Sequence, residues 1–140
     1  MKFEDYHLAT EILKGIRLLG FKRPTDIQFK SIPPIFRGED VLAVAQTGTG
    51  KTAAFAIPVL NMLHNRMVNA PRVDGVKCIV MVPTHELALQ IADVFKGIGR
   101  FTKIKVLALI GGVDQDPQIE TLEKRVDVLV ATPGRMFDLI

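Results

Sequence analysis

The sequence contains little cysteine, few aromatic residues and no long apolar run. Its 140 residues include 1 cysteine, 1 tyrosine and no tryptophan. The single cysteine, Cys78, excludes an internal disulfide, and its place in the apolar stretch KCIVMV indicates a buried, unreactive thiol. We therefore expect neither a disulfide-stabilised scaffold nor redox chemistry.

Long apolar segments are also lacking, and the charge is close to balanced. No apolar run approaches the roughly 20 residues that a membrane-spanning helix requires. The N-terminal stretch MKFEDYHLATE has acidic residues where a secretory signal has its apolar centre. We therefore expect a cytoplasmic protein with no membrane partner. The formal net charge of +3 is compatible with a polyanionic partner, but many ordinary domains carry as much.

What the chain does contain is the composition of one globular domain, with 48% hydrophobic and 24% charged residues. Apolar residues at helical spacing predict a helix over 7–19 that ends at Gly20. Thr25 and Gln28 form a capping-box pattern at the start of a second, short helix. Pro33 and Pro34 are expected to disturb that helix.

The rest of the chain alternates between predicted strands and predicted helices. Apolar runs without polar alternation predict strands buried on both faces at 41–45, 78–82, 104–110 and 126–131. Helices are predicted at 51–64, 85–97 and 115–124 and from about 133, with a surface loop over 65–75. This order predicts an α/β fold in which helices flank a parallel sheet. Without repeats or linkers, we expect one domain over 1–140, with an N-terminal region 1–36 and a core 40–140.

The stretch AQTGTGKT, which ends at Thr52, follows the first predicted strand and precedes a predicted helix. Its spacing is that of a phosphate-binding P-loop, except that Ala45 replaces the first glycine. Gly48 and Gly50 allow backbone conformations that turn N–H groups toward an anion. Lys51 can reach the outer phosphates, and the Thr52 hydroxyl can ligate Mg²⁺. The pattern predicts a nucleoside triphosphate site. The alternative is a glycine-rich turn with an incidental lysine.

Together with its surroundings, this loop resembles the DEAD-box RNA helicases. The stretch GFKRPTDIQ is similar to the family's adenine-recognising Q motif, and Phe3 lies upstream at the distance that the family shows for an isolated aromatic residue. AQTGTGKT, PTHELALQ, a glycine pair and TPGR follow in the family's order and span nearly the whole chain. The resemblance implies a RecA-like P-loop fold that uses ATP and Mg²⁺ and binds RNA.

The resemblance implies that Phe21 packs on the adenine and that Gln28 hydrogen-bonds its edge. An amide has a donor and an acceptor side by side, which matches that edge of the base. Alternatively, Gln28 only closes the capping box and Phe21 is a core aromatic. The residues implied for ATP are Phe3, Phe21, Arg23, Thr25, Gln28, Gln46, Thr47, Gly48, Thr49, Gly50, Lys51 and Thr52, of which Lys51 and Thr52 are also catalytic and Thr52 is the Mg²⁺ ligand.

The later motifs resemble the family's contacts to the RNA backbone. Thr84 and Thr132 could cap helices whose exposed N–H groups face phosphates, and Arg135 would add a charge. His85 stands where the family usually has arginine, which weakens the expected contact. Alternatively, the threonines only cap and the glycines only turn. The residues implied for RNA are Pro83, Thr84, His85, Gly111, Gly112, Thr132, Pro133, Gly134 and Arg135.

The sequence contains no DEAD tetrapeptide. In the family, that motif supplies the aspartate that holds magnesium and the glutamate that positions water, and a second RecA-like domain supplies arginines. We therefore expect a first RecA-like domain that is incomplete, truncated before the DEAD motif, with a gap in its sheet and no activity alone. The full-length protein would couple ATP hydrolysis to RNA clamping and local duplex unwinding. An ATP-gated RNA clamp or assembly platform is the alternative.

Overall fold

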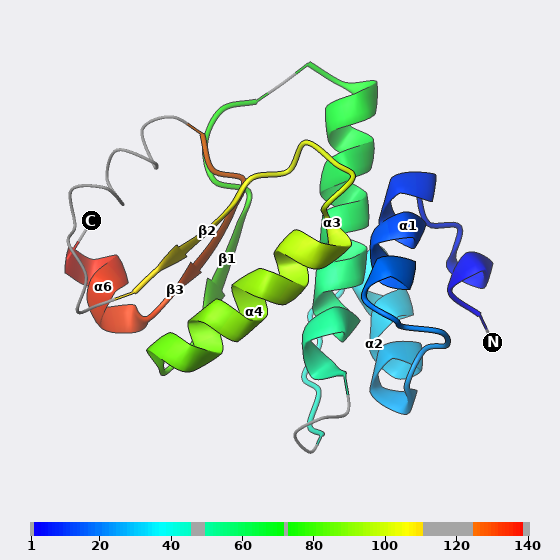
Figure 1. Ribbon diagram of the computed structural model, residues 1–140, viewed down its shortest axis with the longest axis horizontal. Helices are drawn as coiled ribbons and strands as arrows, with labels where there is room; N and C mark the ends of the chain where they lie inside the picture. The colour runs from blue at the N-terminus through cyan, green and yellow to red at the C-terminus, as the bar shows by residue number, and fades with distance from the viewer. Residues whose placement is uncertain (1, 46–49, 72, 111–124, 139–140) are drawn as a thin grey trace. The chain divides into compact units, whose positions relative to one another are not determined.

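The computed structural model describes residues 2–45, 50–71, 73–110 and 125–138 of the chain (Figure 1). By their contacts, the residues divide into two compact units. The first comprises Met1–Ala70 with Gly97–Lys103, and the second comprises Pro71–Lys96 with Ile104–Ile140. None of the helices within the described ranges is long and apolar enough to cross a membrane.

The first unit is helical. Its elements are the 3₁₀ helix η1 (Phe3–Tyr6) and the helices α1 (Thr10–Leu18), α2 (Asp26–Phe36) and α3 (Lys51–Asn69). Gly20 follows α1 with φ of 83°, a left-handed conformation that suits glycine, so the predicted end of this helix is confirmed. The core of the unit includes small and branched apolar side chains that recur at helical spacing, among them Ile12, Ile16, Ile32, Ala53, Ala56, Ile57 and Leu60.

The helix α2 packs against α3 and contains the adjacent prolines Pro33 and Pro34. We expected Pro33 and Pro34 to disturb this helix, but it continues through them to Phe36. Each proline removes one backbone hydrogen bond, yet both lie in the last turn, where little of the helix remains to be disrupted. The helix α3 also extends beyond its predicted end and includes residues assigned to a loop, so the connection to the sheet is shorter than predicted.

The second unit is a three-stranded parallel sheet with the order β1-β3-β2. The strands are β1 (Cys78–Met81), β2 (Val106–Leu109) and β3 (Val128–Ala131). The helix α4 (His85–Ile98) joins β1 to β2, and α6 (Pro133–Asp138) follows β3 (Figure 1). The central strand β3 is buried along its whole length, as its unbroken apolar sequence predicts. The parallel sheet and three of the predicted strands are therefore confirmed.

Two predictions about the core turn out differently. Residues 41–45 do not form a strand, and the side chains of Leu42 and Val44 are 95% and 89% exposed. A strand exists only where a neighbour completes its backbone hydrogen bonds, and the described residues place none beside this segment. Cys78 is half-buried, and burial raises the pKa of its thiol, in line with an unreactive side chain. The predicted helix 115–124 lies outside the described residues.

Candidate nucleotide and RNA sites

Gln28 joins the second helix to the phosphate loop within the first unit. Its side-chain oxygen accepts the Thr25 N–H at 2.9 Å, which confirms the predicted capping box. Its side-chain nitrogen donates to the Gly50 carbonyl at 3.1 Å. Gln28 is 2% exposed, and both bonds are partly buried. Because these bonds occupy one lone pair and one N–H, the amide retains one acceptor position and one donor.

Gly50 is the N-cap residue of α3 and has a conformation that requires glycine. Its φ is 82°, and a Cβ at this position would collide with the amide nitrogen of Gln28. No side chain among the described residues caps α3, and its first turn contains no acidic residue. The positive end of this helix is therefore not neutralised by the described residues, as an anion-binding helix requires. Lys51 is exposed and Thr52 is half-buried in this first turn.

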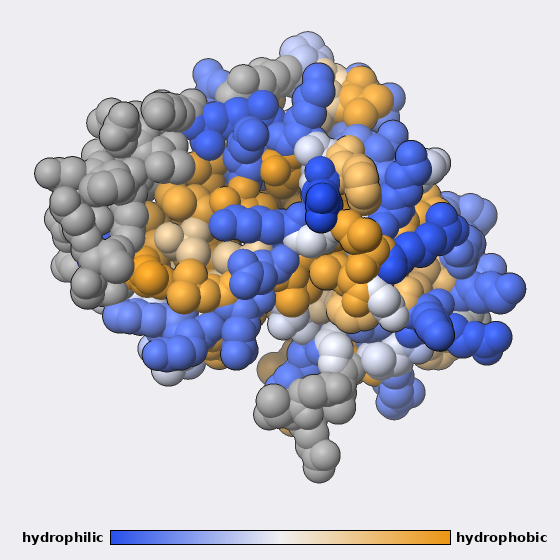
Figure 2. Space-filling view, in the orientation of Figure 1, coloured by the Kyte–Doolittle hydropathy of each residue, from blue (hydrophilic) through white to orange (hydrophobic). Residues whose placement is uncertain are grey.

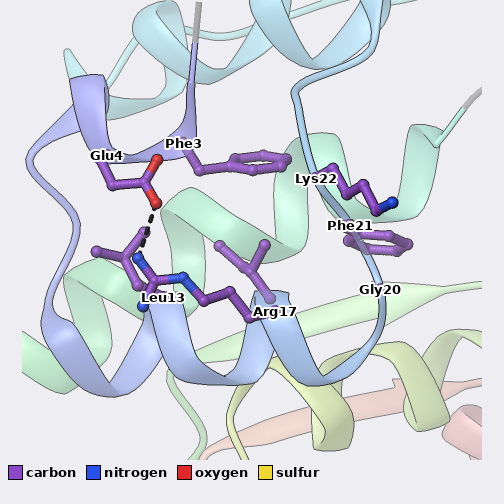
Figure 3. Close-up of a pocket in the computed structure, with 8 residues that line it drawn as sticks. Phe3, Glu4, Leu13, Arg17, Gly20, Phe21 and Lys22 are labelled. Atoms are coloured by element: carbon purple, nitrogen blue, oxygen red, sulfur yellow. Dashed lines mark hydrogen bonds and ion pairs between the residues drawn. The ribbon is translucent and has the colours of Figure 1, made fainter.

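Phe3 and Phe21 line a common cavity of about 280 Å³ in the first unit (Figure 3). Leu13, Ile16 and Arg17 of α1 also line it. Phe3 is buried, whereas Phe21 is half-buried. The two aromatic residues that the Q-motif resemblance singled out thus come together, although 18 positions separate them in the chain.

An ion pair closes one side of this cavity. The Arg17 guanidinium donates to Glu4 Oε1 at 2.7 Å, and this bond lowers the pKa of the Glu4 carboxyl (Figure 3). Since Glu4 belongs to η1 and Arg17 to α1, the pair ties the segment that carries Phe3 to the helix beside it. Both side chains are about half exposed, so solvent screens the attraction between them.

The remaining residues expected to bind ATP are distributed differently. Arg23 and Thr25 are exposed. Lys51 lines a second cavity, of about 240 Å³, between α2 and α3, and not the cavity of the two aromatic residues. Gln46, Thr47, Gly48 and Thr49 lie outside the described residues.

The residues expected to bind RNA follow the carboxyl ends of the strands in the second unit. Pro83 comes after β1 and Thr132 directly after β3, while β2 leads through Ile110 toward the glycine pair. Met81 and Leu109 are both in register with Ala131, so the three strand ends lie level. Neighbouring parallel strands place these ends at one edge of the sheet. Gly111 and Gly112 themselves lie outside the described residues.

Thr84 and Thr132 both precede helices, as predicted. The Thr84 hydroxyl accepts the Leu87 N–H at 3.2 Å, so this threonine caps α4. The Thr132 carbonyl accepts the Met136 N–H at 3.0 Å, and its own N–H donates to Leu109 at 3.3 Å. Thr84 is exposed and Thr132 is buried, so only the first hydroxyl meets solvent.

Of the other residues expected to bind RNA, His85, Pro133 and Gly134 are exposed, and Arg135 is not. Arg135 is 6% exposed, and its Nε donates to the Ile110 carbonyl at 2.9 Å. It therefore joins α6 to the end of β2, immediately before the glycine pair.

Comparison with known proteins decides the family. The family model described as DEAD/DEAH box helicase matches residues 25–140. The chain belongs to this family. It is 46% identical over 98% of its length to an ATP-dependent RNA helicase, DHH1, from Yarrowia lipolytica. It is 42% identical over 97% of its length to the DEAD-box ATP-dependent RNA helicase RhpA from Helicobacter pylori.

Solved helicase structures share the fold. A DEAD box protein from the hyperthermophile Methanococcus jannaschii covers 99% of the chain with a TM-score of 0.87 and 39% identity. A hypothetical ATP-dependent RNA helicase from Sulfolobus tokodaii covers 92% with a TM-score of 0.78 and 40% identity. The chain covers 36% and 35% of these two structures, and about a quarter of each curated relative, 25% of DHH1 and 26% of RhpA. The predicted RecA-like fold of a DEAD-box helicase is confirmed.

Two polar residues of this helicase domain were not anticipated. Asp127 is 1% exposed, and its Oδ2 accepts the Lys105 N–H at 2.8 Å while Lys77 Nζ lies 3.3 Å from Oδ1. It therefore ties the starts of all three strands together. Asn61 is 4% exposed and accepts the Ala9 N–H at 2.8 Å. Polar residues inside apolar sequence, as in RVDVLV and VLNML, were the available signals.

Proposed function

We propose that the protein containing this chain is an ATP-dependent RNA helicase, and that the chain supplies its nucleotide cradle and part of its RNA-contact surface. One observation carries the assignment of the nucleotide site. Gln28 of the Q motif donates to the Gly50 carbonyl, so the residue expected to read the base is bonded to the loop expected to hold the phosphates. An incidental glycine-rich turn would not account for that contact.

Base recognition follows from the hydrogen-bonding groups of the Gln28 amide that the two described bonds do not use. One donor and one acceptor remain on its amide, and adenine offers a complementary acceptor and donor on one edge. Guanine presents two acceptors, N7 and O6, on the corresponding edge, so the free acceptor position of Gln28 would meet no donor. Phe21 would pack on the base, and Phe3 lines the same cavity as Phe21, whereas Gln28 does not line it.

The phosphates would lie against the first turn of α3. Lys51 contributes a charge to the outer phosphates, and the Thr52 hydroxyl, together with phosphate oxygens, would hold Mg²⁺. Mg²⁺ prefers oxygen ligands, so the Thr52 hydroxyl is a suitable one. The first turn of α3 contains no acidic side chain that would repel an anionic ligand. When bound, Mg²⁺ neutralises charge that develops during phosphoryl transfer.

RNA would lie across the strand ends of the second unit. Thr84 and His85 contribute the exposed start of α4, while the glycine pair and TPGR contribute the neighbouring strand ends. The DEAD motif of the full-length protein would supply the aspartate that holds Mg²⁺ and the glutamate that positions water. A second RecA-like domain would complete the clamp and supply the arginines. A cytoplasmic location, expected from the N-terminal sequence, belongs to the same proposal.

The test is a comparison of nucleotides and variants in the full-length protein. We expect RNA-stimulated phosphate release from ATP, lost in Lys51→Ala, and a preference for ATP over GTP of about tenfold or more in competition binding. An unpaired buried amide costs about 1–3 kcal/mol, which sets the size of this preference. Gln28→Ala should reduce it. Equal affinity of the unmutated protein for ATP and GTP would contradict the base assignment, and phosphate release indifferent to RNA would contradict the helicase assignment.

A further inference from the structure

The helix α1 begins without a capping side chain of its own. Its N-cap residue, Ala9, has no side chain that could accept a hydrogen bond. Asn61, in the middle of α3, supplies the acceptor instead, because its Oδ1 receives the Ala9 N–H at 2.8 Å. Asn61 is 4% exposed, so this bond is shielded from water.

A second contact lies beside the first, two residues after Ala9 in α1 and three residues after Asn61 in α3. His64 Nε2 lies 3.1 Å from Glu11 Oε2, and the His64 side chain is 13% exposed. The pKa of the Glu11 carboxyl is lowered by its own backbone N–H at the helix start and by this histidine. Asn61 and His64 are three positions apart on α3, hence on one face, and together they hold the first turn of α1.

The two helices serve the two halves of the nucleotide site. The first residue of α3 is Lys51, which belongs to the phosphate loop. From α1, Leu13, Ile16 and Arg17 line the cavity of the two aromatic residues, and the chain passes from the end of α1 to Phe21. Arg17 also ties η1, and with it Phe3, to this helix. The cavity of Phe3 and Phe21, which the proposed function assigns to the base, is called the base cavity below. The position of α1 on α3 therefore sets where this base cavity lies relative to Lys51 and the phosphate loop.

We propose that Asn61, assisted by the Glu11–His64 contact, is a positioning residue that aligns the base cavity with the phosphate loop. The inference rests on the proposed nucleotide site. Asn61 does not touch the nucleotide in this arrangement and acts through α1. Its loss should weaken ligands that need base and phosphates together, and should not weaken a ligand that uses the phosphate loop alone.

The experiment measures the affinity of the full-length protein for ATP, GTP and inorganic tripolyphosphate, each with Mg²⁺. Asn61→Leu removes the acceptor with a side chain of similar shape, and Asn61→Asp replaces the amide oxygen with a carboxylate oxygen that can still accept the Ala9 N–H. We expect Asn61→Leu to weaken ATP binding about threefold to tenfold, the value of one buried hydrogen bond. Its affinity for tripolyphosphate should stay within about twofold, and Asn61→Asp should bind ATP as the unmutated protein does.

Asn65→Leu is the matched control, because Asn65 is an exposed asparagine on the same helix, one turn further on. It should bind all three ligands normally. Equal losses for ATP and tripolyphosphate, or no loss of ATP binding in Asn61→Leu, would overturn the proposal. If Asn61→Leu does not fold, the same measurement is made on His64→Leu, which should bind ATP more weakly and tripolyphosphate with unchanged affinity. Equal binding of ATP and GTP by the unmutated protein would instead show that the base site, and hence the proposed function, was wrong.

Discussion

His85 is the residue of the proposed RNA-contact surface whose chemistry departs from the family pattern. It lies in the first turn of α4, directly after the Thr84 cap, and is exposed. Arginine carries a permanent charge and can bind phosphate with two N–H groups, whereas imidazole is charged over only part of the pH range. The contribution of this position to RNA binding is therefore open to direct measurement.

We predict that His85→Arg tightens RNA binding by the full-length protein at neutral pH. One additional phosphate contact should steepen the dependence of log affinity on log salt by about 0.7 on single strands. Sequence preference should stay flat, because phosphate contacts carry no base information. The control is Gln90→Arg, which adds the same charge to an exposed position of α4 further from the strand ends. An unchanged slope in His85→Arg would show that position 85 does not face the RNA.

Arg135 shows what a motif cannot reveal about a single side chain. TPGR marks an arginine at a strand end, and the strand end is where the structure places it. The sequence does not indicate that this arginine is 6% exposed and donates to the Ile110 carbonyl. Burial depends on how α6 packs on the sheet, since Met136 in the same helix contacts the core formed by Leu109 and Leu129. Direct contact of Arg135 with RNA stays a prediction.

At the scale of single elements, α1 shows how a glycine can be required inside a helix. Gly15 is buried in α1, and a Cβ on it would collide with the backbone carbonyl of Ile98. A mid-helix glycine usually costs about 1 kcal/mol relative to alanine. Here the close approach between α1 and residues 97–98 outweighs that preference, because a backbone carbonyl cannot move aside as a flexible side chain can.

We therefore predict that Gly15→Ala destabilises the protein although it raises helix propensity. Overpacking costs about 1–3 kcal/mol and the propensity gain is roughly 1 kcal/mol, so the net effect is a loss. Gly134→Ala in α6 is the control, since no atom lies within 4 Å of a Cβ at Gly134. The free energies of unfolding in urea should show a decrease for the first variant and no decrease for the second. A more stable Gly15→Ala protein would refute the close packing.

The elements that the sequence predicts well are those with strong local signals. Helical spacing and the capping box located α1 and α2, and unbroken apolar runs located the three strands of the sheet. The run 41–45 carries the same signal, yet forms no strand, because strand formation depends on neighbours that a local pattern does not contain. The long-range contacts of Asn61 and Asp127 escaped prediction for the same reason, since each joins segments more than 20 residues apart.

At the scale of the whole chain, apolar surface remains uncovered in both units. Val41, Leu42 and Val44 in the first unit are 40%, 95% and 89% exposed, and Ile79 and Met81 on the edge strand β1 are 51% and 49% exposed. Figure 2 shows apolar surface over the sheet of the second unit. Exposed apolar surface can mark an interface where it gathers into a patch. The chain covers about a third of the solved helicases that it resembles. We therefore expect further parts of the full-length protein to bury these apolar residues.

The last prediction is that the 140-residue chain binds phosphate-bearing ligands weakly but does not hydrolyse ATP. Phosphoryl transfer requires a held metal, an oriented water and a cation at the transferring group, and an arginine supplied by a partner domain alone is worth about 10³–10⁵ in rate. Lys51, Thr52 and the start of α3 provide only the cradle, and within the described ranges no three His, Cys, Asp or Glu side chains gather where they could hold a metal ion. The rate of phosphate release by the 140-residue chain with Mg²⁺ and RNA should equal that of its Lys51→Ala variant. The rate of the full-length protein should exceed that of its own Lys51→Ala variant. RNA-stimulated release by the 140 residues, abolished by Lys51→Ala, would mean that the catalytic groups lie within this chain.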